Sequence, residues 1–319
     1  MSGPLRVAVV VPSYRVSRQI LGVLAAIPED VAQIYVIDDL CPEATGHVVE
    51  AATTDRRVRV LRHVENLGVG GAVVTGYRQA IADGMDIIVK LDGDGQMDPA
   101  LIPHLVKPIV EGRADYTKGN RFYSFDLLRT MPAVRLVGNA ALSLINKIAS
   151  GYWSIMDPTN GYTAIHTKLL QLLPLGVIEP RYFFESDMLY HVGLVRACVI
   201  DVPMRSLYAG ETSSLSIRNV LLRFPGKYAI RTLKRFAYSY LLRDFNAGSV
   251  ETILGGALLL FGVVFGAIRW TTGFVNAEMA SSGTVMLAAL PVILGVQLLL
   301  SALYYDIQNQ PRDALHPLL

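Results

Sequence analysis

Two aspartates separated by one glycine give the strongest chemical signal in the sequence. Asp92 and Asp94 stand in the segment 92–96, Asp-Gly-Asp-Gly-Gln, directly after the apolar run 87–91. Carboxylates at this spacing can reach one cation, and the glycines let the backbone turn tightly beside a phosphate. Mg²⁺ and similar ions are often held by one or two carboxylates together with substrate phosphates. An ordinary acidic turn fits the same residues, whereas a calcium loop of the EF-hand type does not, because its later acidic ligand is missing.

Other polar motifs also follow apolar runs that read as strands. Pro12 and Tyr14 end the first run, and Asp38 and Asp39 end the second. Strands are predicted at 6–12, 34–37, 58–61 and 87–91, and helices at 17–27, 72–82 and 99–110. Strands that alternate with helices indicate an α/β fold with a doubly wound, mostly parallel sheet. Ligands of such sheets bind at the carboxyl ends of the strands, so we expect these motifs to converge.

A glycine-rich segment, 66–72, lies between the third strand and a helix. It does not match the G-x-G-x-x-G pattern of dinucleotide-binding proteins. A helix N-terminus with glycines could still face the diphosphate of a nucleotide, which makes Gly68 a candidate contact. Glycines that permit close packing are an equally good interpretation.

The bulk composition excludes several classes of protein. The chain has 319 residues and a net charge of +2, so no strong positive field favours nucleic acid as a partner. Two isolated cysteines, Cys41 and Cys198, do not form a disulfide framework and favour a reducing compartment. The N-terminus has no pattern typical of a signal peptide. Hydrophobic residues make up 52% of the chain, which is high for a soluble enzyme and suggests a membrane.

The hydrophobic residues gather near the C-terminus. Two long apolar segments predict membrane spans at about 251–273 and 284–305, although two buried core helices are the alternative. Basic residues precede the first span, at Arg231, Lys234, Arg235 and Arg243, whereas the segment 271–283 has no lysine or arginine. The positive-inside rule therefore predicts a multi-pass protein of the cytoplasmic (inner) membrane whose residues 1–245 face the cytosol.

The segment 216–245 joins these two parts. Its basic residues recur at three- or four-residue spacing among apolar ones, which predicts an amphipathic helix at the membrane interface. Packing against the preceding domain is the alternative. We therefore expect three parts: a catalytic domain at 1–215, juxtamembrane helices at 216–248, and a transmembrane hairpin with a short cytoplasmic tail at 249–319.

The order of the motifs resembles one known family. Val-Val-Val-Pro-Ser-Tyr, Ile-Asp-Asp, Asn-Leu-Gly-x-Gly-Gly-Ala and Leu-Asp-Gly-Asp-Gly-Gln-x-Asp-Pro follow one another as in the family 2 glycosyltransferases of GT-A fold. Within that family the chain is most similar to the dolichyl- and polyprenyl-phosphate sugar synthases. The resemblance covers residues 6–215, and several of these synthases share a C-terminal hairpin of two spans.

The resemblance implies roles for the candidate residues on the donor side. Pro12 and Tyr14, with Asp38 or Asp39, would contact the base and ribose of the nucleotide. Asp92, Asp94 and Gln96 would hold Mg²⁺ or Mn²⁺ and the donor diphosphate. The family often has Asn-Glu after the tyrosine, where this chain has Arg15-Val16, so the identity of the base stays open.

It also implies an acceptor site and a set of acidic residues. Arg121, Arg135 and Asn139 match positions that bind the acceptor phosphate. Asp157 matches a loop beside the reacting sugar, and Glu185 and Asp187 match an acidic helix start below it. The segment 208–215 lacks the arginine and lysine of the family pattern, so Arg205 or Arg218 is a candidate third phosphate ligand. Surface arginines, a turn cap at Asp157 and helix N-terminal charges at Glu185 and Asp187 are the alternatives.

The resemblance implies inverting, metal-dependent transfer of a hexose from a UDP- or GDP-sugar to a polyprenyl phosphate. A lipid phosphate is largely a dianion near neutral pH, which explains why no strong base stands out. Asp157 or Glu185 could orient the sugar hydroxyls. A polysaccharide synthase is a second interpretation, but its Gln-x-x-Arg-Trp signature is missing. A non-catalytic membrane scaffold is a third, and a homo-oligomer is compatible with each.

Overall fold

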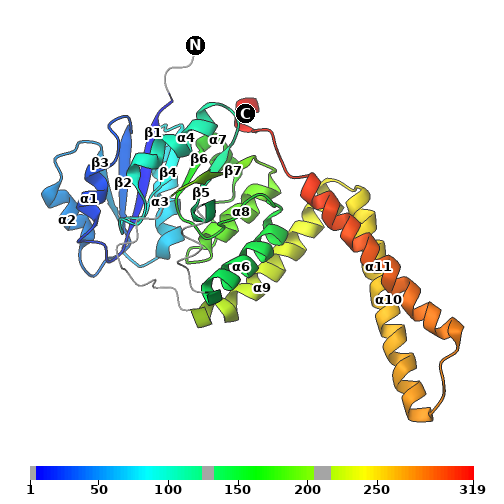
Figure 1. The fold of residues 1–319 in the computed structure, drawn as a ribbon. Coiled ribbons are helices and arrows are strands. Elements are labelled where there is room, and N and C mark those ends of the chain that lie inside the picture. The colour runs from blue at the N-terminus through cyan, green and yellow to red at the C-terminus, as the bar shows by residue number, and fades with distance from the viewer. Residues whose placement is uncertain (1–4, 124–132, 205–216) are drawn as a thin grey trace. The chain divides into compact units, whose positions relative to one another are not determined.

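The computed structural model describes residues 5–123, 133–204 and 217–319. The chain forms two compact units (Figure 1). The first comprises Met1–Thr232 and Pro311–Leu319, and the second comprises Leu233–Gln310. The first unit therefore extends beyond the boundary predicted at residue 215, and it includes the C-terminal tail that the sequence grouped with the hairpin.

A seven-stranded sheet forms the centre of the first unit, in the order β3-β2-β1-β4-β6-β5-β7. Its strands are β1 (Val7–Ser13), β2 (Gln33–Asp38), β3 (Val58–Arg62), β4 (Ile87–Lys90), β5 (Tyr116–Asn120), β6 (Thr163–His166) and β7 (Val199–Pro203). Only β6 runs antiparallel to its neighbours β4 and β5 among the described pairings. The predicted α/β class with a mostly parallel sheet is confirmed.

Helices cover both faces of this sheet. They are α1 (Ile20–Ala25), α2 (Thr45–Ala52), α3 (Gly68–Ala82), α4 (Ile102–Val110), α7 (Thr167–Leu172) and α8 (Phe184–Leu194). Two further helices, α6 (Ala133–Ser150) and α9 (Ile217–Phe236), pack on α8. Successive strand residues point to opposite faces. In β1, Val9 and Val11 pack with α1, α2 and α4, whereas Ala8 and Val10 pack with α3, α7 and α8. Each face of the sheet is therefore a separate buried core.

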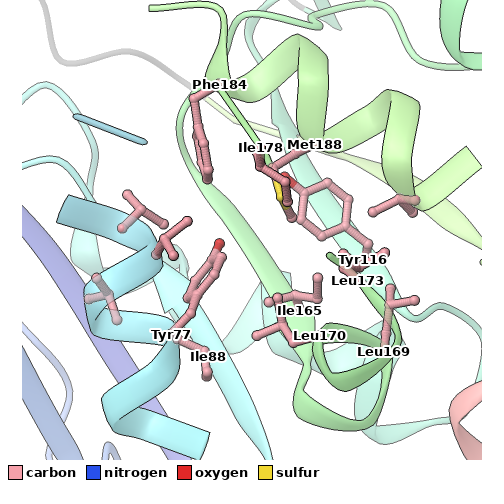
Figure 2. Packing of buried hydrophobic residues seen from close by; sticks show 14 of the residues in the cluster. Tyr77, Ile88, Tyr116, Ile165, Leu169, Leu170, Leu173, Ile178, Phe184 and Met188 are labelled. Atoms are coloured by element: carbon pink, nitrogen blue, oxygen red, sulfur yellow. The ribbon is translucent and has the colours of Figure 1, made fainter. Parts of the chain in front are cut away.

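The core beneath α3 and α8 contains large aromatic side chains. Tyr77 of α3 and Tyr116 of β5 are almost fully buried there (Figure 2). Ile88, Ile165 and Met188 fill the space around the two tyrosines. This packing fixes α8, and with it Glu185, against the strand that precedes the Asp92–Gln96 loop.

Helix α3 begins earlier than predicted, because the glycine-rich segment forms its first turn. Gly68 has φ +85°, in the left-handed region that glycine adopts without strain. A methyl group at Gly70 would lie 2.5 Å from the carbonyl oxygen of Glu179. Close packing of α3 against the segment before α8 therefore accounts for these glycines.

The C-terminal tail packs on the first unit. The Asp115 carboxylate accepts hydrogen bonds from the backbone N–H groups of Leu315, His316 and Cys198, at 2.7–2.9 Å. The ring of His316 stacks on that of His166 with centroids 4.3 Å apart. The chain after the hairpin is thus anchored to the sheet at the end of β6.

The second unit is a hairpin of α10 (Ala247–Asn276) and α11 (Ser282–Gln308). Both helices are long and apolar enough to cross a membrane, with mean hydropathies of 2.0 and 2.3, and the predicted spans lie within them. The helices approach closely at glycines: a methyl group at Gly255 would lie 3.0 Å from the Gly295 carbonyl oxygen. Within the unit, Arg235 pairs with Asp306, which also accepts from the hydroxyl of Tyr240.

Candidate active site

The loops after β1 and β4 meet where the order of the strands reverses. The two strands are parallel neighbours, and β2 lies on the other side of β1. Gly93 and Gly95 pack on residues 16–23, at the start of α1. Pro12 is buried in β1, whereas Tyr14 is 44% exposed beside Arg15. The structure therefore brings Tyr14 to the same edge as the Asp92–Gln96 loop, as expected for a ligand site in such a sheet.

Asp38 and Asp39 are both buried, and their carboxylates bind backbone N–H groups. Asp38 accepts from Cys41 at 2.7 Å and Gly46 at 2.8 Å. Asp39 accepts from Leu67 at 2.8 Å and Gly68 at 2.7 Å, and His63 Nδ1 lies 2.7 Å from its Oδ1. These contacts order the loop after β2 and the start of α3. Nucleotide contacts by Asp38, Asp39 and Gly68 stay a prediction.

The donor chemistry of the Asp92–Gln96 loop suits a divalent ion. Asp92, Asp94 and Gln96 are all half-buried at the end of β4. Asp94 Oδ1 accepts a hydrogen bond from the backbone N–H of Gln96 at 3.0 Å, which keeps the turn compact. No group of three or more acidic, histidine or cysteine residues that could hold a metal occurs in the described part of the chain. Two carboxylates fit an ion that takes its remaining ligands from water and substrate phosphates.

Below this loop lies a buried lysine. The Nζ atom of Lys90 lies 2.7 Å from Asp92 Oδ1 and 3.2 Å from Glu185 Oε1. Burial opposes the charge of Lys90, but the two carboxylates outweigh this effect and raise its pKa above the ordinary value. A methyl group at Gly161 would lie 2.2 Å from Nζ and 2.8 Å from Asp92 Oδ2. The start of α8 and the loop before β6 therefore both meet the Asp92–Gln96 loop.

Arg121 and Asp157 form a two-pronged ion pair at the carboxyl end of β5. Arg121 Nε donates to Asp157 Oδ2 at 2.7 Å, and Nη2 donates to Oδ1 at 2.9 Å. The side chain of Asp157 is 1% exposed, whereas that of Arg121 is 28% exposed. Arg121 thus holds a buried carboxylate with one edge of its guanidinium and still reaches the surface.

Asp187 lies deeper than the other predicted acidic residues. It is fully buried, and its carboxylate accepts from Arg231 Nε at 2.5 Å, Arg231 Nη2 at 3.1 Å and the backbone N–H of Glu179 at 2.9 Å. These contacts tie α8 to α9. A catalytic role for Asp187 stays a prediction, and its visible role is to position these elements.

The remaining acceptor candidates lie partly outside the described side chains. Asn139 is half-buried on α6, and Arg135 belongs to the first turns of the same helix. The side chains of Arg135 and Arg218 are outside the described set, and Arg205 is outside the described residues. The structure thus brings Asp92, Glu185, Asp157 and Arg121 to one end of the sheet, and it leaves the rest of the predicted acceptor site untested.

Residues 8–173 match the family described as glycosyl transferase family 2, which covers more than half of the chain. The chain belongs to glycosyl transferase family 2. It is 32% identical, over 56% of its own length and 70% of the relative, to the UDP-N-acetylglucosamine–dolichyl-phosphate N-acetylglucosaminyltransferase of Methanococcus voltae. It is 30% identical, over 63% of its length and 83% of the relative, to the undecaprenyl-phosphate mannosyltransferase of Micrococcus luteus.

Solved structures support the fold of this glycosyltransferase. Glucosyl-3-phosphoglycerate synthase from Mycobacterium tuberculosis, in complex with Mn²⁺, UDP-glucose and phosphoglyceric acid, superposes with a TM-score of 0.53. The alignment covers 72% of this chain and 79% of that one at 20% identity. Similarity at this level establishes a common fold. The chemistry of the site must be argued from its own residues.

Two other buried charged residues near the candidate site, Lys118 and Asp201, are not predicted from the sequence. Lys118 is fully buried in β5 and donates to the carbonyl oxygen of Asn160, and burial lowers its pKa to about 8. Asp201 in β7 accepts from Asn120 Nδ2 at 2.7 Å and from the backbone N–H of Met156 at 2.9 Å. For Asp201, as for Lys90, a charged residue inside an otherwise apolar strand was the available signal; β5 around Lys118 offers no such contrast.

The raised pKa of the Asp201 carboxyl should be visible in the way the stability of the protein depends on pH. Burial raises the pKa of this carboxyl to about 6, and its Oδ1 atom has no partner among the described groups. An unfolded aspartate has a pKa near 3.9, so between about pH 4 and 6 the folded glycosyltransferase binds more protons than the unfolded chain. Its contribution to stability therefore falls as the pH rises through this window.

Asparagine does not titrate in this range. We therefore expect the stability of Asp201→Asn, relative to that of the wild type, to increase as the pH rises from 4.5 to 7. The change should be on the order of 2 kcal/mol, from about 1.36 kcal/mol per pKa unit. Thermal unfolding of both full-length proteins in detergent measures this difference. An equal difference in melting temperature at the two pH values would contradict the assignment.

Proposed function

We propose that this glycosyltransferase moves a hexose from a UDP- or GDP-sugar to a polyprenyl phosphate at the cytoplasmic face of a membrane, with inversion at the anomeric carbon. The observation that carries the proposal is the convergence of two charged sets at one end of the sheet. The Asp92–Gln96 loop suits a metal-bound diphosphate, and Arg121 suits an anionic acceptor. The names of the relatives from M. voltae and M. luteus support a lipid phosphate as that acceptor.

On the donor side, Asp94 and Gln96, with Asp92, are the residues that would hold Mg²⁺ or Mn²⁺. When bound, such an ion stabilises negative charge on the leaving diphosphate. Tyr14 lies at the same edge of the sheet with an exposed ring on which a nucleotide base can rest. Asp38 and Asp39 contribute by ordering the loops around this edge through their backbone contacts.

On the acceptor side, Arg121 supplies positive charge at a surface-accessible position. Guanidinium groups bind phosphate through paired hydrogen bonds, and Asp157 already holds this one in a fixed orientation. A phosphate monoester is mostly dianionic near neutral pH, so it attacks the sugar without losing a proton to the protein. Attack on the face opposite the leaving diphosphate inverts the anomeric centre.

Membrane association supports a lipid acceptor. The chain has two helices that could cross a bilayer, and α6 adds an apolar surface to the first unit. On α6, Val137, Leu144, Ile145 and Ile148 are 37–68% exposed. The opposite side of the helix packs through Ala149 on Phe183 and Tyr228. Since α6 and α9 contain no acidic residue, both suit an anionic lipid surface.

A donor and acceptor panel tests the proposal. Membranes that contain the full chain are incubated with radiolabelled UDP- and GDP-sugars, polyprenyl phosphate and Mg²⁺ or Mn²⁺. We expect label to move from one donor into an organic-extractable, mild-acid-labile product. A parallel reaction without polyprenyl phosphate is the control. Label in a water-soluble polymer instead would favour a chain-extending enzyme, and no transfer from any donor would contradict the proposal.

A further inference from the structure

Lys90 occupies a costly position for a charged residue. It ends β4 (Ile87–Lys90), where every residue is buried, and its side chain is 1% exposed. An ammonium group loses favourable hydration when it leaves water, and charged partners can offset that loss. Replacement by an apolar residue of similar length would avoid this loss. The presence of a lysine here is therefore explained by what its two carboxylate partners do.

These partners come from segments that are far apart in the sequence. Asp92 belongs to the loop after β4 and Glu185 to the first turn of α8, and both carboxylates contact the same Nζ atom. Gly161, in the loop before β6, closes over this atom, because any side chain there would collide with Nζ and with Asp92 Oδ2. One charge thus joins the loop after β4 to α8, and the loop before β6 packs directly over it.

The contact also gives the two carboxylate oxygens of Asp92 different roles. Oδ1 accepts from Lys90 at 2.7 Å, so Oδ2 is the oxygen that remains for a cation. Without the ammonium group, Asp92 and Glu185 would be two carboxylates around an empty position. Their mutual repulsion would turn Asp92 away from its present orientation.

We propose that Lys90 is a positioning residue of the donor site, which orients Asp92 toward the metal-bound diphosphate and balances the charge of Glu185. The inference rests on the proposed function, because it concerns the same donor site. Groups that orient metal ligands typically change metal affinity or activity by 10–100-fold when they are removed. Lys90 acts through Asp92 and needs no contact with the sugar.

The test measures binding, independently of turnover. The purified full-length enzyme in detergent is titrated calorimetrically with UDP and with GDP, each in the presence of Mn²⁺. We expect Lys90→Met to weaken binding of the accepted nucleotide by about 10–100-fold. Adding Glu185→Gln to Lys90→Met should recover part of that loss, because it removes one of the two repelling carboxylates.

The matched control is Ile88→Val, which removes buried packing two residues earlier on the same face of β4. This substitution changes no charge at the donor site, so nucleotide affinity should stay within about threefold, less than 1 kcal/mol. If Lys90→Met does not fold, Lys90→Gln, which keeps a hydrogen-bond donor but no charge, takes its place with the same expectation.

The possible failures can be distinguished. A folded Lys90 variant that binds UDP or GDP as tightly as the wild type would overturn the positioning role and leave the proposed function intact. Equal weakening by Ile88→Val would also overturn it, because the effect would then be general loss of packing. Failure of the wild type to bind either nucleotide with Mn²⁺ would count against the proposed function itself.

Discussion

Replacing Asp94 by alanine is expected to lower sugar transfer by at least about 100-fold while the protein stays folded. Asp94 is half-buried in the loop at the end of β4, where its Oδ1 atom accepts from the backbone of Gln96. A bound divalent ion supplies several kcal/mol of charge stabilisation in the transition state, and each 1.36 kcal/mol is tenfold in rate. Initial rates with the donor and acceptor identified by the panel, over a range of Mn²⁺ concentrations, measure the effect.

Asp98→Asn is the matched control for this change. Asp98 lies four residues further on, and its Oδ1 atom accepts from the backbone N–H of Ala100 at 3.0 Å, a contact that asparagine can also make. Removing this charge should leave the rate within about twofold, a change of less than 1 kcal/mol. Unchanged transfer by Asp94→Ala would remove the metal-binding assignment of this residue.

The second large effect concerns the Arg121–Asp157 pair. Replacing Arg121 alone should lower both the stability of the protein and its sugar transfer. Arg121→Ala leaves the carboxylate of Asp157, 1% exposed, without its cation. Breaking a buried ion pair by removing one partner typically costs about 3–5 kcal/mol. We expect a fall in melting temperature of roughly 6–20 °C, at about 2–4 °C per kcal/mol for a unit of this size. Transfer to the lipid phosphate should fall with it.

The double variant Arg121→Ala, Asp157→Asn distinguishes the two roles. Asparagine carries no charge, so most of the lost melting temperature should return, whereas transfer should stay low because the phosphate still lacks its guanidinium. Arg113→Ala is the control, since Arg113 pairs with Glu111 at the surface and such pairs contribute at most about 1 kcal/mol. If transfer also returned in the double variant, Arg121 would act only by holding Asp157, and its acceptor role would be wrong.

The fold was largely predictable because its signals are local. Apolar runs such as 87–91 and helical spacing such as 99–110 reveal strands and helices without reference to the rest of the chain. The antiparallel β6 was not predicted. Only four residues long, Thr163–His166 carries too short a pattern to indicate its direction or its place between β4 and β5.

The candidate site was predictable only in part. Glu185 was expected near the donor, and the structure places it 3.2 Å from the lysine that holds Asp92. The contact itself could not be foreseen, because Lys90 and Glu185 are separated by 95 positions and no local pattern links them. Lys90 was read as part of an apolar strand, and neither of its partners is visible from that strand alone.

Packing between helices likewise decides which basic residue the buried carboxylate of Asp187 contacts. Asp187 and Arg231 belong to different helices, and only the contact of α8 with α9 places the carboxylate on the guanidinium. The glycines at 68–71 illustrate the same limit, since a diphosphate site and close packing require the same small residue. Gly70 lies against Glu179 and Phe184, and this contact identifies its packing role.

The sequence by itself determined the family, the α/β class and the apolar hairpin, and it supplied the candidate residues for a metal and a phosphate. These properties depend on residue type and short spacing, which can be read along the chain. The tertiary structure decided which charges meet: Lys90 with Asp92 and Glu185, and Arg121 with Asp157. The strength of an ion pair depends on distance and burial, and both arise only when distant segments pack together.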